Sequence, residues 1–453
     1  MKRPIEKIMP DPNKPEVGPG GLIHTEALRK IRKRLTEHFF KEAQVTGNAA
    51  ADASARKKIE DEIPGALRAA DASLAEDVRS ALTRAVIDEL FGFGPIQPLL
   101  EDPSVTEVMV NRADRVYVER NGKPMRTDIV FDDEAHVRQV IDRILRPLGK
   151  TLDGSNPLVD ARLPDGSRVN VVIPPVAIAG SCLTIRKFSR SRLTMQDLVN
   201  FGSLTPLVSE FLKACVQARL NIVVAGGTGS GKTTLLNVLS GCIGPDERIV
   251  TIEDAAELKL SQDHVITLEA KKSGADNGAE VTIRELVRNA LRMRPERIVV
   301  GECRGSEALD MLQAMNTGHD GSLTTLHANS PRDAISRIET MSLMAGIDFP
   351  IRVIREQIGS AIQLMVQQSR MRDGSRKVTS VTEIAGMEGD KVLMQELFKF
   401  KEIPSANSAN KVEGCLVPCG LRPQFMYKLE NAAIKMPPET FSPQSVNRMK
   451  NAA

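Results

Sequence analysis

The spacing of apolar residues changes twice along the chain and divides it into three parts. The first part, residues 1–85, begins with a stretch rich in Pro, Lys and Gly to about Gly21, which predicts a disordered tail. Apolar residues then recur at helical spacing from Leu22 to Phe39 with Lys and Arg between them, and Ala49 to Ala85 is rich in helix-forming residues. This pattern predicts a small helical extension. Its basic amphipathic helix suits a membrane surface or a neighbouring helix, and we favour the neighbour because that is the commoner use of such a face.

The second part, residues 86–188, has strand-like patterns on both sides of one helical segment. Phe91-Gly-Phe-Gly-Pro95 ends the preceding helix. Strand patterns occupy 105–111, 115–119, 158–173 and 181–188, a helical pattern occupies 134–148, and Asn121-Gly122 favours a hairpin turn. The pattern predicts a small α+β domain.

This α+β part carries three arginines on or beside its strands: Arg162, Arg168 and Arg186. These arginines could simply be solvated side chains on an exposed face of the domain. They equally suit a charged wall that faces the phosphates of a ligand held by the next domain. The spacing alone leaves both interpretations open.

The third part, residues 189–400, starts with a polar linker at 189–194 and then alternates short apolar strands with helical segments. The predicted strands are Ile222–Ala225, Ile249–Glu253, Val265–Glu269, Arg297–Gly301 and Ser322–Leu326. Alternation of this kind predicts an α/β domain with a largely parallel sheet. Residues 401–453 predict a C-terminal tail that includes one short helix at 425–434.

The first strand of the third part runs into a glycine-rich turn and then into an apolar-periodic helix. Gly226, Gly231, Lys232 and Thr233 satisfy the pattern G-x-x-x-x-G-K-S/T in the strand–loop–helix context that it requires. Glycines let backbone N–H groups approach a phosphate closely, and the helix N-terminus adds partial positive charge. The lysine supplies a point charge to the β- and γ-phosphates, and the threonine hydroxyl is placed to hold Mg²⁺. The sequence therefore predicts an ATP and Mg²⁺ site, with binding residues Gly226, Gly227, Thr228, Gly229, Ser230, Gly231, Lys232, Thr233 and Thr234.

Two later strands of the third part end in carboxylates. One apolar run ends in Glu253 and Asp254, and the run that starts at Arg297 continues into Glu302. Ligands of parallel α/β sheets bind beyond the carboxyl ends of the strands. A carboxylate there orients an attacking water or holds Mg²⁺, so we predict catalytic and metal-binding roles for both glutamates, with Thr233 as a further metal ligand. Which glutamate is the general base stays open.

Residues 318–329 are dense in polar side chains around a short strand and contain two of the six histidines, His319 and His327. A histidine at a strand end near the γ-phosphate can sense its loss, whereas a lone histidine is more often a hydrogen-bonded core residue. Because His327 clusters with two threonines and Asn329, we favour a catalytic sensor role for His327.

Composition narrows the classes of function. A chain of 453 residues predicts two or three domains. A net charge of +3 and an aromatic content of 3% without Trp give no general affinity for nucleic acid and few platforms for base stacking. No apolar run approaches the length of a membrane span, which favours a cytoplasmic protein.

In this order, the motifs resemble those of the secretion superfamily of hexameric traffic ATPases. The resemblance rests on four motifs within 226–329: the glycine-rich phosphate-binding loop (P-loop), the Thr-Ile-Glu-Asp box, the Gly-Glu-x-Arg-Gly strand, and the box Gly-His-x-Gly followed by Thr-x-His. It extends more loosely over 87–400. Finer signatures resemble the CpaF/TadA subfamily of Flp (tight-adherence) pilus motors. These signatures lie at 91–95, 160–168, 291–297, 367–374 and 420–423.

The resemblance implies a RecA-like ATPase domain preceded by a PAS-like α+β domain, in a ring of six copies. It implies that nucleotide binds between the two domains and that Arg162, Arg168 and Arg186 reach its phosphates. The implied partner is an inner-membrane platform protein of a pilus or secretion system. The ATPase would then be cytoplasmic, peripheral at the inner face of the inner membrane, and without direct contact to nucleic acid.

The main hypothesis is an ATP-driven motor for pilus assembly or secretion. A nucleic-acid translocase on the same RecA-like core is one alternative, which ATPase stimulation by DNA would support. A nucleotide-gated structural ring is the other, and it would act equally well when hydrolysis is blocked.

Overall fold

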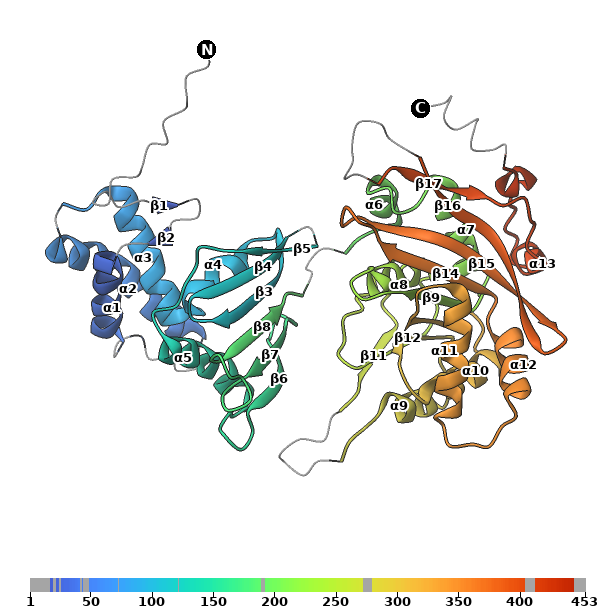
Figure 1. Ribbon diagram of the computed structural model, residues 1–453, viewed down its shortest axis with the longest axis horizontal. Coiled ribbons are helices and arrows are strands. Elements are labelled where there is room, and N and C mark those ends of the chain that lie inside the picture. The colour runs from blue at the N-terminus through green and yellow to red at the C-terminus, as the bar shows by residue number, and fades with distance from the viewer. Residues whose placement is uncertain are drawn as a thin grey trace, which may run out of the picture. The chain divides into compact units, whose positions relative to one another are not determined.

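The computed structural model describes residues 17–18, 22–23, 26–40, 43, 49–71, 73–120, 122–188, 192–271, 279–403 and 412–443. Contacts divide the chain into two compact units, 1–189 and 190–453, which we describe separately (Figure 1). Most of the predicted N-terminal tail, Asn121 of the predicted hairpin turn and the first three linker residues lie outside the described residues.

The first unit begins with three helices that share one apolar core. A two-residue pair of strands, β1 (Val17–Gly18) and β2 (Leu22–Ile23), precedes α1 (Glu26–Phe39), α2 (Ala49–Ala70) and α3 (Glu76–Phe91). Leu28 and Phe39 of α1 are buried together with Ile63 of α2 and Leu82 of α3. The apolar face of the basic helix α1 is therefore packed on neighbouring helices. The helix starts at Glu26, so Leu22 belongs to a strand instead.

The rest of the first unit is a six-stranded antiparallel sheet with one main helix. Its strands follow the order β5-β4-β3-β8-β7-β6. Their bounds are β3 (Val105–Arg112), β4 (Arg115–Arg120), β5 (Lys123–Arg126), β6 (Leu158–Arg162), β7 (Arg168–Val172) and β8 (Cys182–Arg186). Short helices α4 (Gln97–Glu101), η1 (Gly94–Ile96) and η2 (Arg146–Leu148) fill the connections. Alternate strand residues such as Val108 and Ile185 are buried in one core with Val140 and Ile144 of α5 (Glu134–Leu145), and the residues between them lie on the other face of the sheet.

A buried ion cluster joins the helical extension to the sheet. Arg32 of α1 donates to Glu89 of α3 at 2.7 Å and to Asp132, which precedes α5, at 2.6 Å. His136 of α5 lies 3.1 Å from the same Glu89 carboxylate. Buried charges persist when each has a partner, so this cluster holds α1, α3 and α5 in one unit.

The second unit is built on a nine-stranded sheet in the order β11-β10-β12-β13-β9-β14-β15-β16-β17. The strands are β9 (Ile222–Gly226), β10 (Ile249–Glu253), β11 (Val265–Glu269), β12 (Arg297–Cys303), β13 (Leu323–His327), β14 (Leu364–Arg370), β15 (Arg376–Glu388), β16 (Lys391–Glu402) and β17 (Gly414–Pro418). The strands from β11 to β14 are parallel, and β15, β16 and β17 are antiparallel. The sheet is therefore mixed, whereas the sequence predicted a largely parallel one.

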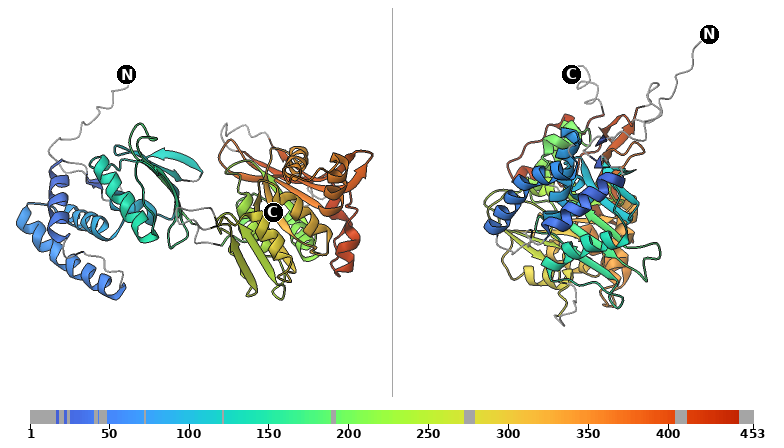
Figure 2. Two further views of the ribbon diagram at one scale, coloured as in Figure 1. Left: turned by 90° about the horizontal axis from the view of Figure 1, so that it is seen from below. Right: turned by 90° about the vertical axis from the view of Figure 1, so that its left-hand side faces the viewer.

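Helices cover both faces of this sheet (Figure 2). Ile222 and Val224 of β9 enter one core together with α7 (Pro206–Gln217) and α8 (Lys232–Ser240). Val223 and Ala225 enter the opposite core together with α9 (Ile283–Ala290), α10 (Glu307–Asn316), α11 (Pro331–Leu343) and α12 (Ile351–Ala361). Because both faces are covered, the central strands read as continuous apolar runs.

The C-terminal segment packs into the same unit. Strand β17 pairs with β16, and 3-10 helix η3 (Pro438–Phe441) follows α13 (Met426–Asn431). Phe425 and Phe441 lie against Phe211, with ring centroids 6.3 and 5.5 Å apart. The sequence assigned these residues to a tail, but the antiparallel strands and aromatic contacts place them in the core.

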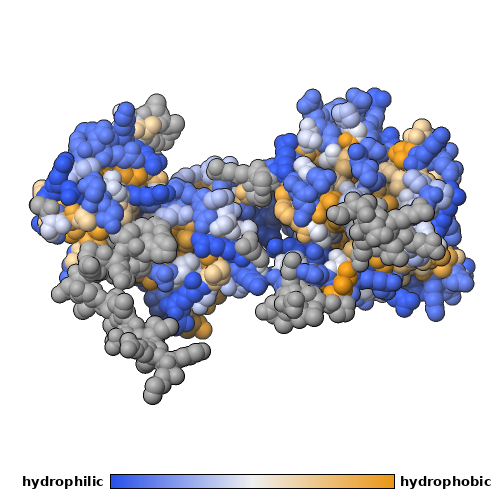
Figure 3. Space-filling view, turned by 90° about the horizontal axis from the view of Figure 1, so that it is seen from above, coloured by the Kyte–Doolittle hydropathy of each residue, from blue (hydrophilic) through white to orange (hydrophobic). Residues whose placement is uncertain are grey.

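Hydrophilic residues cover most of the face seen in Figure 3, and apolar residues form small scattered patches. Within the described ranges, none of the helices combines the length and the apolar character that a bilayer crossing requires.

Candidate active site

The glycine-rich loop lies at the centre of the large sheet. Strand β9 is fully buried between β13 and β14, and it leads directly into the loop that ends at α8. Gly229 and Gly231 have φ angles of +68° and +94°, a region that only glycine enters at no steric cost. A Cβ atom at Gly226 would collide with the backbone carbonyl of Gln368. The backbone of the turn therefore favours glycine at 229 and 231, and the neighbouring strand β14 (Leu364–Arg370) favours glycine at 226.

The start of α8 has the properties of an anion site. Gly231 is its N-cap and makes no side-chain cap hydrogen bond, so the partial positive charge of the helix N-terminus is not offset by a capping side chain of that residue. Lys232 is 8% exposed and its Nζ donates to the carbonyl oxygen of Gly227 at 3.0 Å. The hydroxyl of Ser230 donates to the same oxygen at 2.8 Å. A bound phosphate would compete with this carbonyl for the lysine ammonium.

Glu253 ends β10 and is 3% exposed. Its carboxylate accepts backbone N–H groups of Glu257 at 3.0 Å and of Leu258 at 3.2 Å. These bonds fix the carboxylate at the carboxyl end of the sheet. The backbone donors also satisfy a charge that burial would otherwise penalise.

Glu302 lies in β12 and is more accessible, with 23% of its side chain exposed. Arg304 donates to Glu302 at 2.7 Å and to Asp254 at 3.2 Å, so one guanidinium joins the acidic ends of β12 and β10. In the sequence, Arg304 was only the arginine of the Gly-Glu-x-Arg-Gly motif, and no role was predicted for it. Its i+2 spacing from Glu302 along an extended chain was the signal that the two side chains lie on one side.

His327 ends β13 and is paired in register with Gly226 of β9. Its Nε2 lies 3.4 Å from the hydroxyl of Thr228 in the glycine-rich loop. Partial burial lowers the pKa of His327, and the nearby Lys232 cation lowers it further, while Glu302 acts in the opposite direction. His327 is therefore a mainly neutral imidazole in contact with the loop.

The three predicted arginines form one row across the sheet of the first unit. Arg162 pairs with Arg168 between β6 and β7, and Arg168 pairs with Arg186 between β7 and β8. Directly paired residues share a face of a sheet, so the row lies opposite the face that packs on α5. Arg162 also lies over the ring of Phe188, 5.8 Å from its centroid.

Comparison with known proteins places this chain in a family. A model of the family described as type II/IV secretion system protein matches residues 89–412. The chain belongs to this family. It is accordingly a nucleotide-binding protein and an ATP hydrolase.

Named relatives of this secretion ATPase occur in several bacteria. A putative conjugal transfer protein of Mycobacterium tuberculosis is 39% identical over 312 residues, which cover 68% of this chain and 88% of the relative. The type IV secretion system protein VirB11 of Brucella suis is 34% identical over 313 residues, with coverages of 63% and 87%. A crystal structure of the Brucella suis VirB11 ATPase with sulphate matches 63% of this chain and 94% of its own, at 33% identity and a TM-score of 0.35.

Sequence reasoning missed two residues of the secretion ATPase that contact the glycine-rich loop, Gln368 of β14 and Arg376 of β15. The Nε of Arg376 donates to the carbonyl oxygen of Gly229 at 3.2 Å, and a Cβ atom at Gly231 would lie 3.3 Å from the Gln368 side chain. Both residues follow the loop by more than 130 positions, so no local pattern linked them to it.

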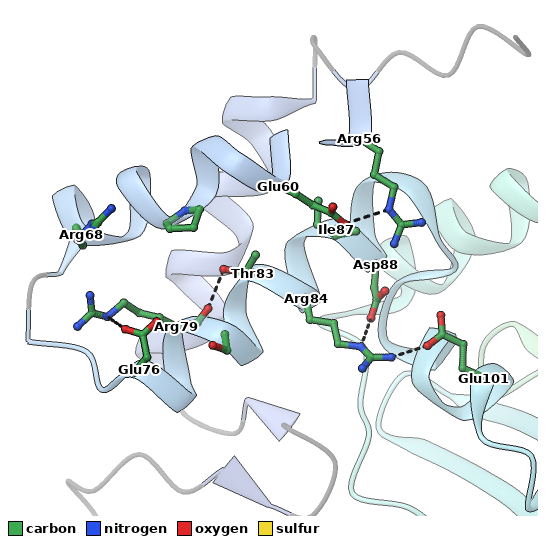
Figure 4. Close-up of a pocket in the computed structure, with 12 residues that line it drawn as sticks. Arg56, Glu60, Arg68, Glu76, Arg79, Thr83, Arg84, Ile87, Asp88 and Glu101 are labelled. Atoms are coloured by element: carbon green, nitrogen blue, oxygen red, sulfur yellow. Dashed lines mark hydrogen bonds and ion pairs between the residues drawn. The ribbon is translucent and has the colours of Figure 1, made fainter. Parts of the chain in front are cut away.

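The secretion ATPase also has a pocket of about 540 Å³ in its first unit (Figure 4). Its lining comes entirely from 56–101 and includes none of the predicted site residues. Arginines and carboxylates alternate around it, as in the pairs of Arg84 with Asp88 and with Glu101. Burial raises the pKa of Asp88 to about 6.

Proposed function

We propose that this secretion ATPase is a hexameric cytoplasmic motor that couples ATP hydrolysis to pilus assembly or secretion through an inner-membrane platform protein. The observation that carries the proposal is the convergence of four motifs at the carboxyl ends of neighbouring strands, which form one edge of the large sheet. Register pairing sets Gly226 beside His327, and β10 and β12 bring Glu253 and Glu302 to the same edge. These groups supply phosphate binding, water activation and a contact that responds to the γ-phosphate.

The finer assignment is to the CpaF/TadA subfamily of Flp pilus motors. Its support is the set of subfamily signatures at 91–95, 160–168, 291–297, 367–374 and 420–423. The fold proposed with it is a RecA-like ATPase domain, with the phosphate-binding strand β9 between β13 and β14, preceded by a PAS-like domain. Named relatives involved in conjugal transfer support the broader class of traffic ATPase.

The residues fit Mg²⁺ and a triphosphate. The partial positive charge at the N-terminus of α8 suits phosphate oxygens, and Thr233 lies in the first turn of this helix. In the described ranges no group of three or more His, Cys, Asp or Glu side chains forms a metal cage. This agrees with Mg²⁺, which is held by few protein ligands and by the phosphates themselves. We assign Thr233, Glu302 and Glu253 to it, the last two directly or through water.

The proposed motor step is a closure of the two units around the nucleotide. The row formed by Arg162, Arg168 and Arg186 would supply charge-assisted hydrogen bonds to the phosphates of ATP. Loss of the γ-phosphate would weaken these bonds and release the closure. In a ring of six, sequential closure would move the platform protein at the inner face of the inner membrane.

Two variants separate the motor from a nucleotide-gated ring. Lys232→Ala removes the phosphate ligand, and Glu302→Gln removes the proposed base while it keeps the shape of the side chain. A motor requires both residues for pilus assembly in cells. Normal assembly by Glu302→Gln with failure of Lys232→Ala would instead support the structural ring.

A nucleic-acid translocase is tested on the purified protein. The motor predicts that single-stranded and double-stranded DNA leave the ATPase rate unchanged at moderate salt, where non-specific binding is already weak. A several-fold stimulation by DNA would favour the translocase. Particle images with nucleotide check the ring, and a protein that stays monomeric with every nucleotide contradicts the hexamer.

A further inference from the structure

The hairpin of β14 and β15 forms a wall of the glycine-rich loop. Strand β14 runs parallel to β9, and the register pairs Gln368 with Gly226 at the point where the loop begins. The chain then turns over 371–375 and returns as β15, which starts at Arg376. The hairpin approaches the loop closely at both glycines: a Cβ atom on Gly226 would collide with the Gln368 carbonyl oxygen, and one on Gly231 would lie 3.3 Å from the Gln368 Nε2.

Arg376 makes the most direct contact between the hairpin and the loop. Its Nε donates to the carbonyl oxygen of Gly229 at 3.2 Å, and its Cγ lies 3.7 Å from a Cβ built on Gly231. A loop that turns its N–H groups inward toward a phosphate turns carbonyl groups outward. A donor on the outer side therefore stabilises the conformation that binds the anion.

The backbone of Arg376 is held in place on its other side. Its carbonyl oxygen accepts the Ser203 hydroxyl at 2.5 Å, and the N–H of Val378 donates to the carbonyl oxygen of Ser203 at 3.0 Å. The Lys377 ammonium donates to Gly202 at 2.9 Å. The point from which the Arg376 side chain reaches the loop is therefore fixed, and only its side-chain rotamers remain to be ordered by the contact.

Gln368 gives a second reason to expect that this wall serves the nucleotide. Its side chain belongs to a residue that is 3% exposed, and its Oε1 has no hydrogen-bond partner in the described part of the chain. Its Nε2 faces Gly231, 3.3 Å from the position of a Cβ atom there. A buried acceptor without a donor is uncommon in a resting structure.

We propose that Arg376 is a positioning residue of the nucleotide site, which holds the glycine-rich loop in its phosphate-binding conformation through the Gly229 carbonyl. The residue acts on the loop and touches no reacting atom. Because the loop cradles the phosphates that ATP and ADP share, Arg376 contributes equally to the binding of both.

The test compares Arg376→Gln and Arg376→Lys with Arg372→Gln in the full chain. Arg372 lies in the turn that precedes Arg376, is exposed, and forms an ion pair with Glu402, so it controls for loss of charge on this hairpin. Dissociation constants for Mg-ATP and Mg-ADP are measured by calorimetry, together with KM, kcat and Tm. We expect Arg376→Gln to weaken the binding of Mg-ATP and of Mg-ADP by about tenfold, with a matching rise in KM. The kcat should stay within about threefold of the wild-type value, and Tm should stay within about 2 °C of it. Arg376→Lys should recover part of the affinity, because an ammonium also donates to a carbonyl.

Three results would overturn the proposal. In the first, Arg376→Gln binds both nucleotides as tightly as Arg372→Gln does. In the second, ATP binding alone is weakened, which would make Arg376 a γ-phosphate ligand. In the third, affinity and Tm fall together, which would reduce Arg376 to a residue that stabilises the fold. None of these outcomes depends on whether the ATPase drives a pilus.

Discussion

The side chain of Glu253 occupies the space that a Cβ atom on Gly301 would need: such an atom would lie 2.8 Å from the Glu253 Cγ and 3.2 Å from its Oε1. The two residues come from neighbouring parallel strands, β10 and β12. The absence of a side chain at 301 therefore lets the carboxylate lie flat against the adjacent strand. In this position it receives the N–H groups of Glu257 and Leu258.

Gly301→Ala should displace the Glu253 carboxylate. We expect kcat to fall by about tenfold to a hundredfold and Tm to fall by several degrees, since overpacking of a core typically costs about 1–3 kcal/mol. Steady-state ATPase assays and thermal unfolding measure the two effects. Gly154→Ala is the matched control, because no described atom lies within 4 Å of a Cβ built there. An unchanged kcat in Gly301→Ala would remove Glu253 from the chemistry.

Glu302→Gln should leave ATP binding within about threefold of wild type and lower kcat by about a hundredfold or more, as expected for loss of a general base. Glu302 is favoured as the base because it is partly accessible, whereas Glu253 is buried and accepts the backbone N–H groups of Glu257 and Leu258. Single-turnover hydrolysis and nucleotide titration separate the two steps. Full activity of Glu302→Gln, with loss in Glu253→Gln, would reverse the assignment.

Lys232→Ala should abolish measurable turnover and weaken nucleotide binding by about a hundredfold, because it removes the cation nearest to the phosphate site. The fold should persist, since Ser230 still donates to the Gly227 carbonyl that Lys232 contacts. Circular dichroism and Tm monitor the fold alongside the ATPase assay. Turnover that survives this change would refute the location of the site.

Protonation of His327 should lower the ATPase rate at acidic pH. Partial burial and Lys232 lower the pKa of this imidazole below its ordinary value of about 6.5, so it is mainly neutral at pH 7 and gains a proton at lower pH. If the neutral form contacts the loop, kcat falls as the pH drops through that lowered pKa. His327→Gln should lack this acidic limb and show a lower, flatter profile between pH 5.5 and pH 8. An acidic limb that persists unchanged in His327→Gln would assign it to another group.

Asp88 should make the stability of the first unit depend on pH. Burial raises its pKa from 3.8 to about 6, so the folded state binds a proton that the unfolded state does not bind between these values. The cost of its buried charge is complete above pH 6 and is relieved as the pH falls toward 3.8. Asp88→Asn should therefore raise Tm at pH 7.5 by roughly 2–4 °C, for about 1 kcal/mol at this partly solvated site, with a smaller gain at pH 5. A gain in Tm that is the same at both pH values would contradict this account.

Local patterns in the sequence predicted most individual elements. The strands at 249–253 and 265–269 have the predicted bounds, and the helix at 134 starts where its periodicity begins. The strands after 361 were not predicted, although β14, β15 and β16 follow one another as hairpins. Only the parallel pairing of β14 with β9, which attaches these hairpins to the central sheet, joins residues distant in sequence. Strand β17 pairs with β16 across a segment that has no periodic pattern.

The sequence by itself determined which chemistry this protein carries, because a phosphate-binding loop, acidic strand ends and a histidine box are each written in a few consecutive residues. Only the tertiary structure decided which of these side chains meet. Strand register set Gly226 beside His327 in two parallel strands, and it aligned Arg162, Arg168 and Arg186 in one row of the antiparallel sheet. It also brought Arg376 to the loop from the far side of β14. Such contacts are invisible in sequence, because strand pairing joins residues without regard to their distance along the chain.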